Sequence, residues 1–168
     1  TGSGKTYAVW LPILNGLMKS ESKGHTRVIW LTPLRALTSD TETSLKAPVT
    51  EMGLRISIAS RTGDTSAAEK KKLKDHRPDV LITTPESLSL LLADPHSEEH
   101  FKHLECVVVD EWHELLSGKR GVQAELCLAR LRKFSPNLRS WGLSATIGNV
   151  EEALLALTGV NATRASTI

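Results

Sequence analysis

The sequence has few cysteines and no long apolar run, and each shortage excludes a class of protein. Cys106 and Cys127 are the two cysteines. Both lie in apolar runs, so they are predicted to be buried thiols rather than a disulfide pair. No apolar run approaches the ~20 residues of a membrane span, and no signal peptide is present. We therefore expect a cytoplasmic protein without a membrane partner.

The chain also has little excess charge. Its formal net charge is +2, with 40% hydrophobic and 24% charged residues, which are ordinary values for a soluble globular protein. So small a charge neither requires nor excludes a nucleic-acid partner, because the clustering of charges matters more than their sum. A length of 168 residues suits one domain, and residues 1–168 are predicted to form it.

Short β-rich runs alternate with stretches whose apolar residues recur at helical spacing. Strands are predicted at residues 27–31, 55–59, 79–83, 105–110 and 139–143. Helices are predicted at residues 6–19, 34–52, 65–75, 86–93, 122–134 and 150–157, with Pro48 interrupting the second. This alternation implies an α/β fold in which a mostly parallel sheet carries helices on both faces. Ligands of such folds bind at the carboxyl ends of the strands.

The chain opens on residues typical of the second half of a phosphate-binding loop, G-x-x-x-x-G-K-[ST]. Gly2, Ser3 and Gly4 are predicted to present backbone N–H groups to phosphate oxygens. Lys5 would reach the β- and γ-phosphates of ATP, and the Thr6 hydroxyl would bind Mg²⁺. The strand that precedes such a loop is absent, so we expect the first strand to be truncated. On their own, the six residues also fit a Gly-Ser linker that ends in Lys-Thr.

Two carboxylates, Asp110 and Glu111, directly follow the apolar run 106–109. At the end of a buried strand they would face the phosphate loop across the sheet. Asp110 can then hold Mg²⁺, mainly through its waters, and Glu111 can polarise the water that attacks the γ-phosphate. The acidic pair therefore predicts nucleotide hydrolysis.

Several segments, in this order, resemble the motifs of superfamily 2 helicases of the DExH type. Motifs I, II and III are matched by residues 1–6 (TGSGKT), 110–113 (DEWH) and 144–146 (SAT). Motif Ia and the next two nucleic-acid-contact motifs are matched by residues 32–37 (TPLRAL), 61–65 (RTGDT) and 84–88 (TPESL). Residues 110–132 resemble the Lhr group, the large helicase-related proteins, and are closest to the bacterial branch associated with a DNA ligase. The resemblance implies a three-layer RecA-like (P-loop NTPase) domain, the first of two.

The resemblance agrees with the roles given above to the phosphate loop and the acidic pair, and it adds others. His113 would join the catalytic set and, with Ser144 and Thr146, would link the nucleotide state to the grip on a nucleic-acid strand. Residues of the intervening motifs would contact the backbone of that strand: Pro33, Arg35, Gly63, Asp64, Thr84 and Pro85. Such contacts bind phosphates without reading bases, so binding should tolerate any sequence.

The resemblance implies an ATP- and Mg²⁺-dependent DNA helicase or translocase that moves 3′ to 5′ and acts in DNA repair. Its partners would be single-stranded DNA or DNA with a 3′ tail, the second RecA-like domain, and a DNA ligase and nuclease. Two alternatives stay open. The motor could remodel RNA or an RNA–DNA hybrid, or this chain alone could bind nucleotide and strand without turnover.

Some residues fit both a functional and a structural interpretation. The lysine-rich run at residues 70–74 fits a DNA-facing patch or, more commonly, a solvated helix face. His96, His100 and His103 have a spacing that could suit a metal, although solvated histidines are the commoner case.

Tryptophans in apolar runs are predicted to be core residues, namely Trp10, Trp30 and Trp141. Trp112 occupies the variable position of the DExH-like motif, and the sequence does not decide whether it packs or contacts a partner.

Overall fold

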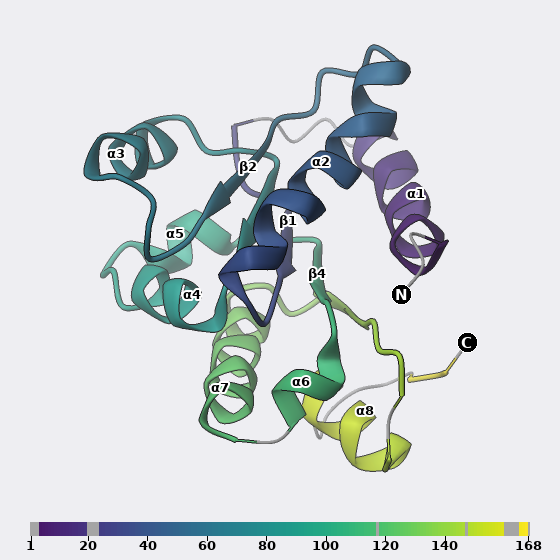
Figure 1. Cartoon of the computed structure of the whole chain (residues 1–168). Helices are drawn as coiled ribbons and strands as arrows, with labels where there is room; N and C mark the ends of the chain where they lie inside the picture. The colour runs from purple at the N-terminus through teal and green to yellow at the C-terminus, as the bar shows by residue number, and fades with distance from the viewer. Residues whose placement is uncertain (1–3, 20–23, 117, 147, 160–164, 168) are drawn as a thin grey trace.

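The computed structural model describes residues 4–19, 24–116, 118–146, 148–159 and 165–167 (Figure 1). Of the predicted phosphate loop, Gly4, Lys5 and Thr6 are described, whereas Gly2 and Ser3 lie outside the described residues. Within these ranges, none of the helices has the length and apolar character needed to cross a membrane.

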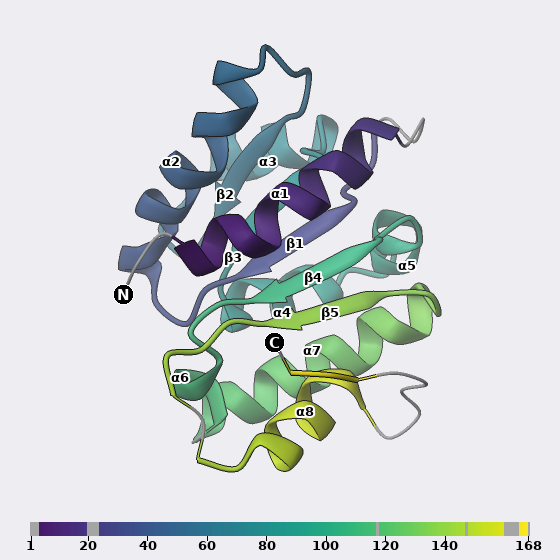
Figure 2. The ribbon, with the colours of Figure 1, turned by 90° about the vertical axis from the view of Figure 1, so that its right-hand side faces the viewer.

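In the described part of the chain, five parallel strands form one sheet (Figure 2). In spatial order they are β2 (Ile58–Arg61), β3 (Val80–Thr83), β1 (Val28–Leu31), β4 (Cys106–Val109) and β5 (Arg139–Gly142). The strands are in step, so that Leu31 lies opposite both Thr83 and Val109. Their carboxyl ends therefore meet at one edge of the sheet, called here the carboxyl edge. The predicted α/β fold with a parallel sheet is confirmed.

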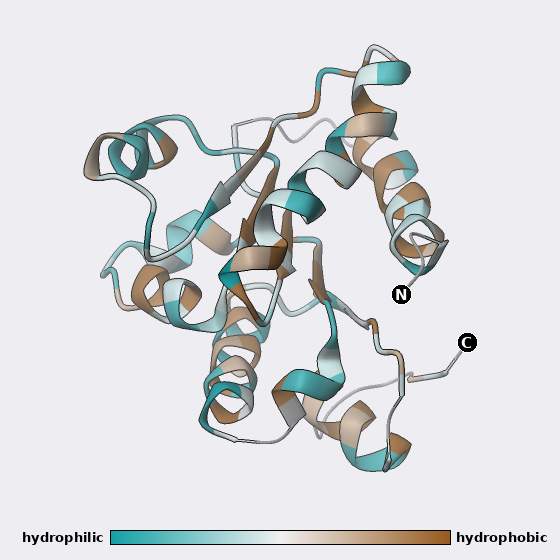
Figure 3. Cartoon of the chain, viewed as in Figure 1, coloured by the Kyte–Doolittle hydropathy of each residue, from teal (hydrophilic) through white to brown (hydrophobic). Residues whose placement is uncertain are grey.

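Helices cover both faces of the sheet, and their apolar sides turn toward it (Figure 3). One face carries α1 (Gly4–Lys19) and α2 (Arg35–Glu51). The other face carries α4 (Pro85–Leu92), α5 (Ser97–Phe101), α6 (Trp112–Leu116), α7 (Lys119–Phe134) and α8 (Val150–Thr158). Helix α3 (Ala67–Asp75) follows β2 and has no buried residue.

The side chains of the central strands build a separate core on each face. Successive residues of a strand point to opposite faces, so Trp30 and Val108 pack against α1 and α2, whereas Ile29 and Val107 pack under the helices of the other face. Strands β1 and β4 are buried along their whole length, as expected for parallel strands covered on both sides.

The two cysteines are free thiols in this interior. Burial raises the pKa of Cys106 to about 12 and that of Cys127 to about 11. Both thiols therefore stay protonated and unreactive at neutral pH, which confirms the prediction that they are buried small apolar groups.

Two predicted boundaries were wrong. Strand β2 spans Ile58–Arg61 rather than residues 55–59, because its register places Ile58 opposite Val80 of β3. Pro48 does not interrupt α2, which continues to Glu51. A proline inside a helix removes one N–H donor, and burial of the neighbouring residue Val49 on the sheet-facing side holds this segment in place.

The sequence missed two short helices and part of a third. Helices α5 and α6 have five residues each, which is too few to show a helical period. Helix α7 begins at Lys119, ahead of the predicted start at residue 122. Tertiary packing forms these turns, because isolated helices this short are unstable in water.

A buried arginine joins several elements at the amino ends of the strands. Arg27 is only 3% exposed, and its guanidinium lies 3.0 Å from the Asp79 carboxylate and donates to the Leu17 carbonyl at 3.0 Å. Asp79 in turn accepts hydrogen bonds from the backbone and hydroxyl of Ser57. The segments before β1, β2 and β3 and the end of α1 are thereby linked through one charged group.

We predict that Arg27→Met lowers the free energy of unfolding by about 3 kcal/mol, because it leaves Asp79 partly buried without its cation. Urea unfolding followed by circular dichroism measures this loss. The control is Arg35→Met, which breaks an ion pair whose side chains are 58% and 72% exposed and should cost under about 1 kcal/mol. Equal losses in the two variants would contradict the prediction.

Candidate functional site

The first turn of α1 lies beside the carboxyl end of β5. The Lys5 ammonium donates a hydrogen bond to the Ser144 carbonyl at 3.1 Å. Figure 2 shows the start of α1, the start of α2 and helix α6 at the same side of the sheet. The positive end of a helix and a lysine therefore meet at the carboxyl edge, an arrangement that attracts phosphate.

Asp110 stands directly after β4 and is held from two sides. Its Oδ2 accepts a hydrogen bond from the indole N–H of Trp30 at 3.2 Å, and its Oδ1 accepts one from the backbone N–H of Glu111 at 3.0 Å. The Asp110 backbone N–H also donates to the Leu31 carbonyl at 2.8 Å. The carboxylate is half-buried and so has a defined direction at the carboxyl edge.

Glu111 has a strained backbone. Its φ is 45°, a left-handed value that residues with side chains seldom adopt outside constrained sites. The turn lets the Glu111 carbonyl accept from the Glu114 N–H at 2.8 Å and sends the Glu111 carboxylate to 3.4 Å from His113 Nδ1. The strain is localised between Asp110 and α6, where the sequence predicted catalytic carboxylates.

His113 joins the segment after β4 to the segment after β5. Its Nδ1 lies 3.0 Å from Ser144 Oγ, and the Ser144 hydroxyl donates to the Thr146 carbonyl at 2.9 Å. Because the single hydroxyl hydrogen is used there, His113 Nδ1 is the donor to Ser144 Oγ. The structure thus brings His113, Ser144 and Thr146 together, as their common predicted role requires.

Trp112 is a core residue, which the sequence had left undecided. It is 1% exposed, its backbone N–H donates to Leu143 O at 2.7 Å, and its indole donates to Ala153 O of α8 at 3.1 Å. A Cβ on Gly142 would lie 3.4 Å from the indole ring. Trp112 therefore locks α6 and α8 against the end of β5.

Three residues predicted to contact nucleic acid lie together beyond β1 and β2. Arg35 Nη1 is 2.7 Å from Asp64 Oδ1, and a Cβ on Gly63 would lie only 2.8 Å from Arg35 Nη2. Glycine at position 63 thus allows the guanidinium to approach the backbone. Of the lysine-rich run, Lys70 donates to the Gly63 carbonyl at 3.2 Å, and Lys74 pairs with Asp94.

The other three predicted contact residues, Pro33, Thr84 and Pro85, are buried. Thr84 Oγ1 accepts from the Ser87 N–H at 3.4 Å and caps α4, whose first residue is Pro85. Thr84 and Pro85 therefore serve the fold first, as the cap and the first residue of α4.

Arg120, which was not among the predicted site residues, connects two of these segments. Its Nη1 donates to the Pro33 carbonyl at 3.4 Å, and its Nε lies 2.8 Å from Glu86 Oε1. Burial acts to raise the pKa of Glu86, but hydrogen bonds from its own backbone and Thr84, with the charge of Arg120, outweigh burial and lower that pKa. Glu86 therefore stays ionised, and Arg120 holds the loop after β1 beside the start of α4. An arginine in the first turn of a helix offers no sequence signal for this role.

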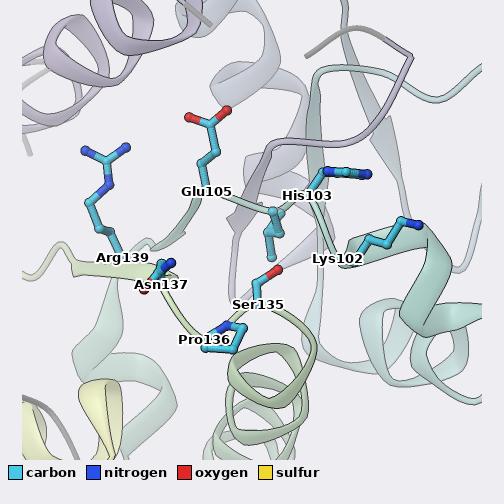
Figure 4. Close-up of a pocket in the computed structure, with 8 residues that line it drawn as sticks. Lys102, His103, Glu105, Ser135, Pro136, Asn137 and Arg139 are labelled. Carbon is cyan, nitrogen blue, oxygen red and sulfur yellow. The ribbon is translucent and has the colours of Figure 1, made fainter. Parts of the chain in front are cut away.

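A cavity of about 310 Å³ lies at the opposite edge of the sheet, before β4 and β5 (Figure 4). Its lining residues are Lys102, His103, Leu104, Glu105, Ser135, Pro136, Asn137 and Arg139. None of the predicted site residues lines it. The chemistry-bearing groups are instead gathered at the carboxyl edge, where ligands of open α/β sheets bind.

The side chains at the carboxyl edge fit ATP and Mg²⁺. Thr6 and Asp110 offer a hydroxyl and a carboxylate, the oxygen ligands that Mg²⁺ prefers. Lys5 and the start of α1 supply positive charge for phosphates. A parallel sheet with these groups at its carboxyl edge defines a nucleotide-binding domain of the RecA-like P-loop class.

Comparison with known proteins gives the family. The profile of the DEAD/DEAH box helicase family matches residues 1–153, and the chain belongs to this family. It is 40% identical over 173 residues to the ATP-dependent helicase Lhr-Core of Sulfolobus acidocaldarius, covering 96% of this chain and 20% of that protein. The chain thus spans about a fifth of the length of such relatives.

The chain is also similar to solved helicase structures. The helicase Lhr of Mycobacterium smegmatis bound to ssDNA and AMP-PNP is 36% identical with a TM-score of 0.78, covering 95% of this chain and 22% of that one. Mss116p bound to ssRNA and AMP-PNP is 26% identical with a TM-score of 0.83, covering 94% and 33%. The recognised resemblance to the Lhr group is confirmed, with archaeal and bacterial relatives alike.

We predict that Gly63→Ala lowers the affinity for a single-stranded oligonucleotide several-fold. The new methyl group would displace Arg35 from its place against the loop, a movement that a flexible surface side chain makes with little loss of stability. Fluorescence anisotropy measures the affinity, and a thermal melt checks the fold. Gly16→Ala is the control, because its Cβ meets no atom within 4 Å. An unchanged affinity in Gly63→Ala would rule out Arg35 as a contact.

Proposed function

We propose that this chain is the first RecA-like domain of an ATP-dependent DNA helicase or translocase that tracks a single strand in the 3′ to 5′ direction. The observation that carries the proposal is the His113–Ser144 contact of 3.0 Å. It joins the acidic segment after β4 to the segment whose carbonyl holds Lys5. The groups that we propose to face the nucleotide are thereby connected to each other and lie on the same edge as Arg35 and Asp64.

Each residue at the carboxyl edge has a part in the proposed hydrolysis. Lys5 and the N–H groups at the start of α1 would orient the β- and γ-phosphates, and Thr6 and Asp110 would hold Mg²⁺. Bound Mg²⁺ would neutralise charge on the phosphates. Glu111, aimed by its left-handed backbone, would accept a hydrogen bond from the attacking water and take its proton.

His113 and Ser144 would couple the nucleotide state to the binding of the nucleic-acid strand. In the structure the Lys5 ammonium is occupied by the Ser144 carbonyl. When phosphate takes the ammonium, the Ser144 segment loses that partner while its hydroxyl stays with His113. A shift of this segment, which continues to Thr146, would change the surface offered to a second domain. Two discrete arrangements of one segment are what coupling between sites requires.

We propose DNA as the nucleic-acid strand that the domain tracks, with RNA as the alternative. The similar Lhr structure holds ssDNA, whereas the similar Mss116p structure holds ssRNA. Arg35, Gly63 and Asp64 offer groups suited to phosphates, which both strands share. Displacement assays on matched DNA, RNA and hybrid duplexes with 3′ tails distinguish the two, and a requirement for an RNA tracking strand would overturn the DNA proposal. A role in DNA repair, a ligase or nuclease partner and a cytoplasmic location stay predictions.

Catalysis would need a second RecA-like domain. An arginine supplied from outside the phosphate loop is worth ~10³–10⁵ in rate in related NTPases. We therefore predict that residues 1–168 alone bind nucleotide and strand but hydrolyse ATP at least ~10³-fold more slowly than the protein with both domains. Steady-state phosphate release measures both rates. Strong DNA-stimulated hydrolysis by residues 1–168 would contradict the two-domain proposal.

In the two-domain protein, we predict that Glu111→Gln binds ATP normally but turns it over ~10²–10⁴-fold more slowly, because the general base is lost. Lys5→Ala should instead lose nucleotide affinity, because the phosphates lose their cation. Calorimetry measures binding and phosphate release measures turnover. Glu114→Gln is the matched control. Glu114 is a neighbouring acid that also lies near His113, at 3.9 Å from Nε2, but it is exposed and has no proposed part in the hydrolysis. Normal turnover in Glu111→Gln would show that another group is the base.

A further inference from the structure

Trp30 donates its only polar hydrogen to the carboxylate that the proposed function assigns to Mg²⁺. The indole N–H of Trp30 lies 3.2 Å from Asp110 Oδ2. Trp30 is on β1 and has no exposed surface, whereas Asp110 follows β4. The apolar setting of Trp30 in the sequence predicted only a core residue, so the hydrogen bond to Asp110 gives this side chain a polar role as well.

Trp10 shows what a purely structural tryptophan looks like in the same core. Its ring packs edge-on against Trp30 with ring centroids 6.4 Å apart, and it is also fully buried. Its indole donates to the Leu45 backbone carbonyl at 3.1 Å. Two buried indoles in contact thus make one hydrogen bond each, one to a neutral carbonyl and the other to a carboxylate at the carboxyl edge.

The bond to Trp30 restrains the direction of the Asp110 carboxylate. Its Oδ1 already accepts the Glu111 backbone N–H at 3.0 Å, and each carboxylate oxygen has a further lone pair available. Among the described residues each oxygen has one protein donor, which defines the plane of the group and leaves a lone pair on each oxygen for a metal. Loss of a group that holds a metal ligand in this way typically lowers metal affinity by roughly 10–100-fold.

We propose that Trp30 is a positioning residue for Asp110, and that its indole N–H sets the affinity of this domain for Mg²⁺-nucleotide. The proposal rests on the metal-binding role given above to Asp110. Trp30 also connects the proposed metal site to the predicted nucleic-acid contacts, because it lies three residues before Pro33, in the strand that leads to Arg35. A movement of the β1 end when a nucleic-acid strand binds would reach the Asp110 carboxylate through one hydrogen bond.

The test compares Trp30→Phe with Trp10→Phe in the intact protein. Each substitution removes one buried indole N–H from the same aromatic pair, but only Trp30→Phe removes the donor to Asp110. Calorimetric titration of ADP at a series of Mg²⁺ concentrations gives the Mg²⁺ concentration at which the increase in ADP affinity is half-maximal. We expect this concentration to rise about tenfold in Trp30→Phe and to stay within about twofold of wild type in Trp10→Phe. Binding of ADP without Mg²⁺ should be the same in all three proteins.

Two outcomes of this comparison overturn the proposal, and they are distinguishable. If wild type binds ADP equally with and without Mg²⁺, the metal-binding role of Asp110 fails and the proposal fails with it. If wild type depends on Mg²⁺ but Trp30→Phe and Trp10→Phe show equal dependence, only the role of Trp30 is wrong.

A second variant covers the case in which Trp30→Phe does not fold. Site-specific replacement of Trp30 by 3-benzothienylalanine keeps the shape of the bicyclic ring and exchanges the N–H for sulfur. The same rise of about tenfold in the required Mg²⁺ is expected, with a melting temperature close to wild type. An unchanged Mg²⁺ requirement in this variant would show that the indole ring fills space and that its N–H has no effect on the metal.

Discussion

The pairing of β1 with β4 is the constraint on which the other features depend. Both strands are buried along their whole length, so every backbone group must be bonded to a neighbouring strand, which allows little freedom of register. That register sets Leu31 opposite Val109 and lets Asp110 bond to the Leu31 carbonyl. A shift of the register by one residue would move Trp30 and Ile29 to opposite faces of the sheet. Asp110 would then lose the indole N–H of Trp30 as a donor.

The described part of the candidate site is a set of hydrogen bonds between segments that meet at the carboxyl edge. Lys5 bonds to Ser144, Ser144 to His113, and Asp110 to Trp30. Each link joins elements from different parts of the chain at the carboxyl edge. Under the proposed function, a phosphate that takes the Lys5 ammonium would release the segment whose Ser144 hydroxyl also contacts His113.

Much of the fold follows from the sequence because apolar periodicity is a local property. The run ending at Val109 indicated a buried strand, and the glycines before Lys5 indicated a phosphate loop, without knowledge of any contact. The predictions that were wrong depended on partners. The register of β2 is set by Val80, Pro48 is held in α2 by packing, and the short helix at Trp112 forms only against its neighbours.

For this protein, the sequence by itself determined the order of the strands and of the longer helices, the residue types that follow the strands, and the family. Side-chain type and spacing are sufficient for those inferences. Tertiary structure alone decided which groups meet: Arg120 with Pro33, Trp112 with Ala153, and Trp30 with Asp110. These partners are far apart in sequence, and an indole N–H looks the same in a sequence whether it bonds to a backbone carbonyl or to a carboxylate.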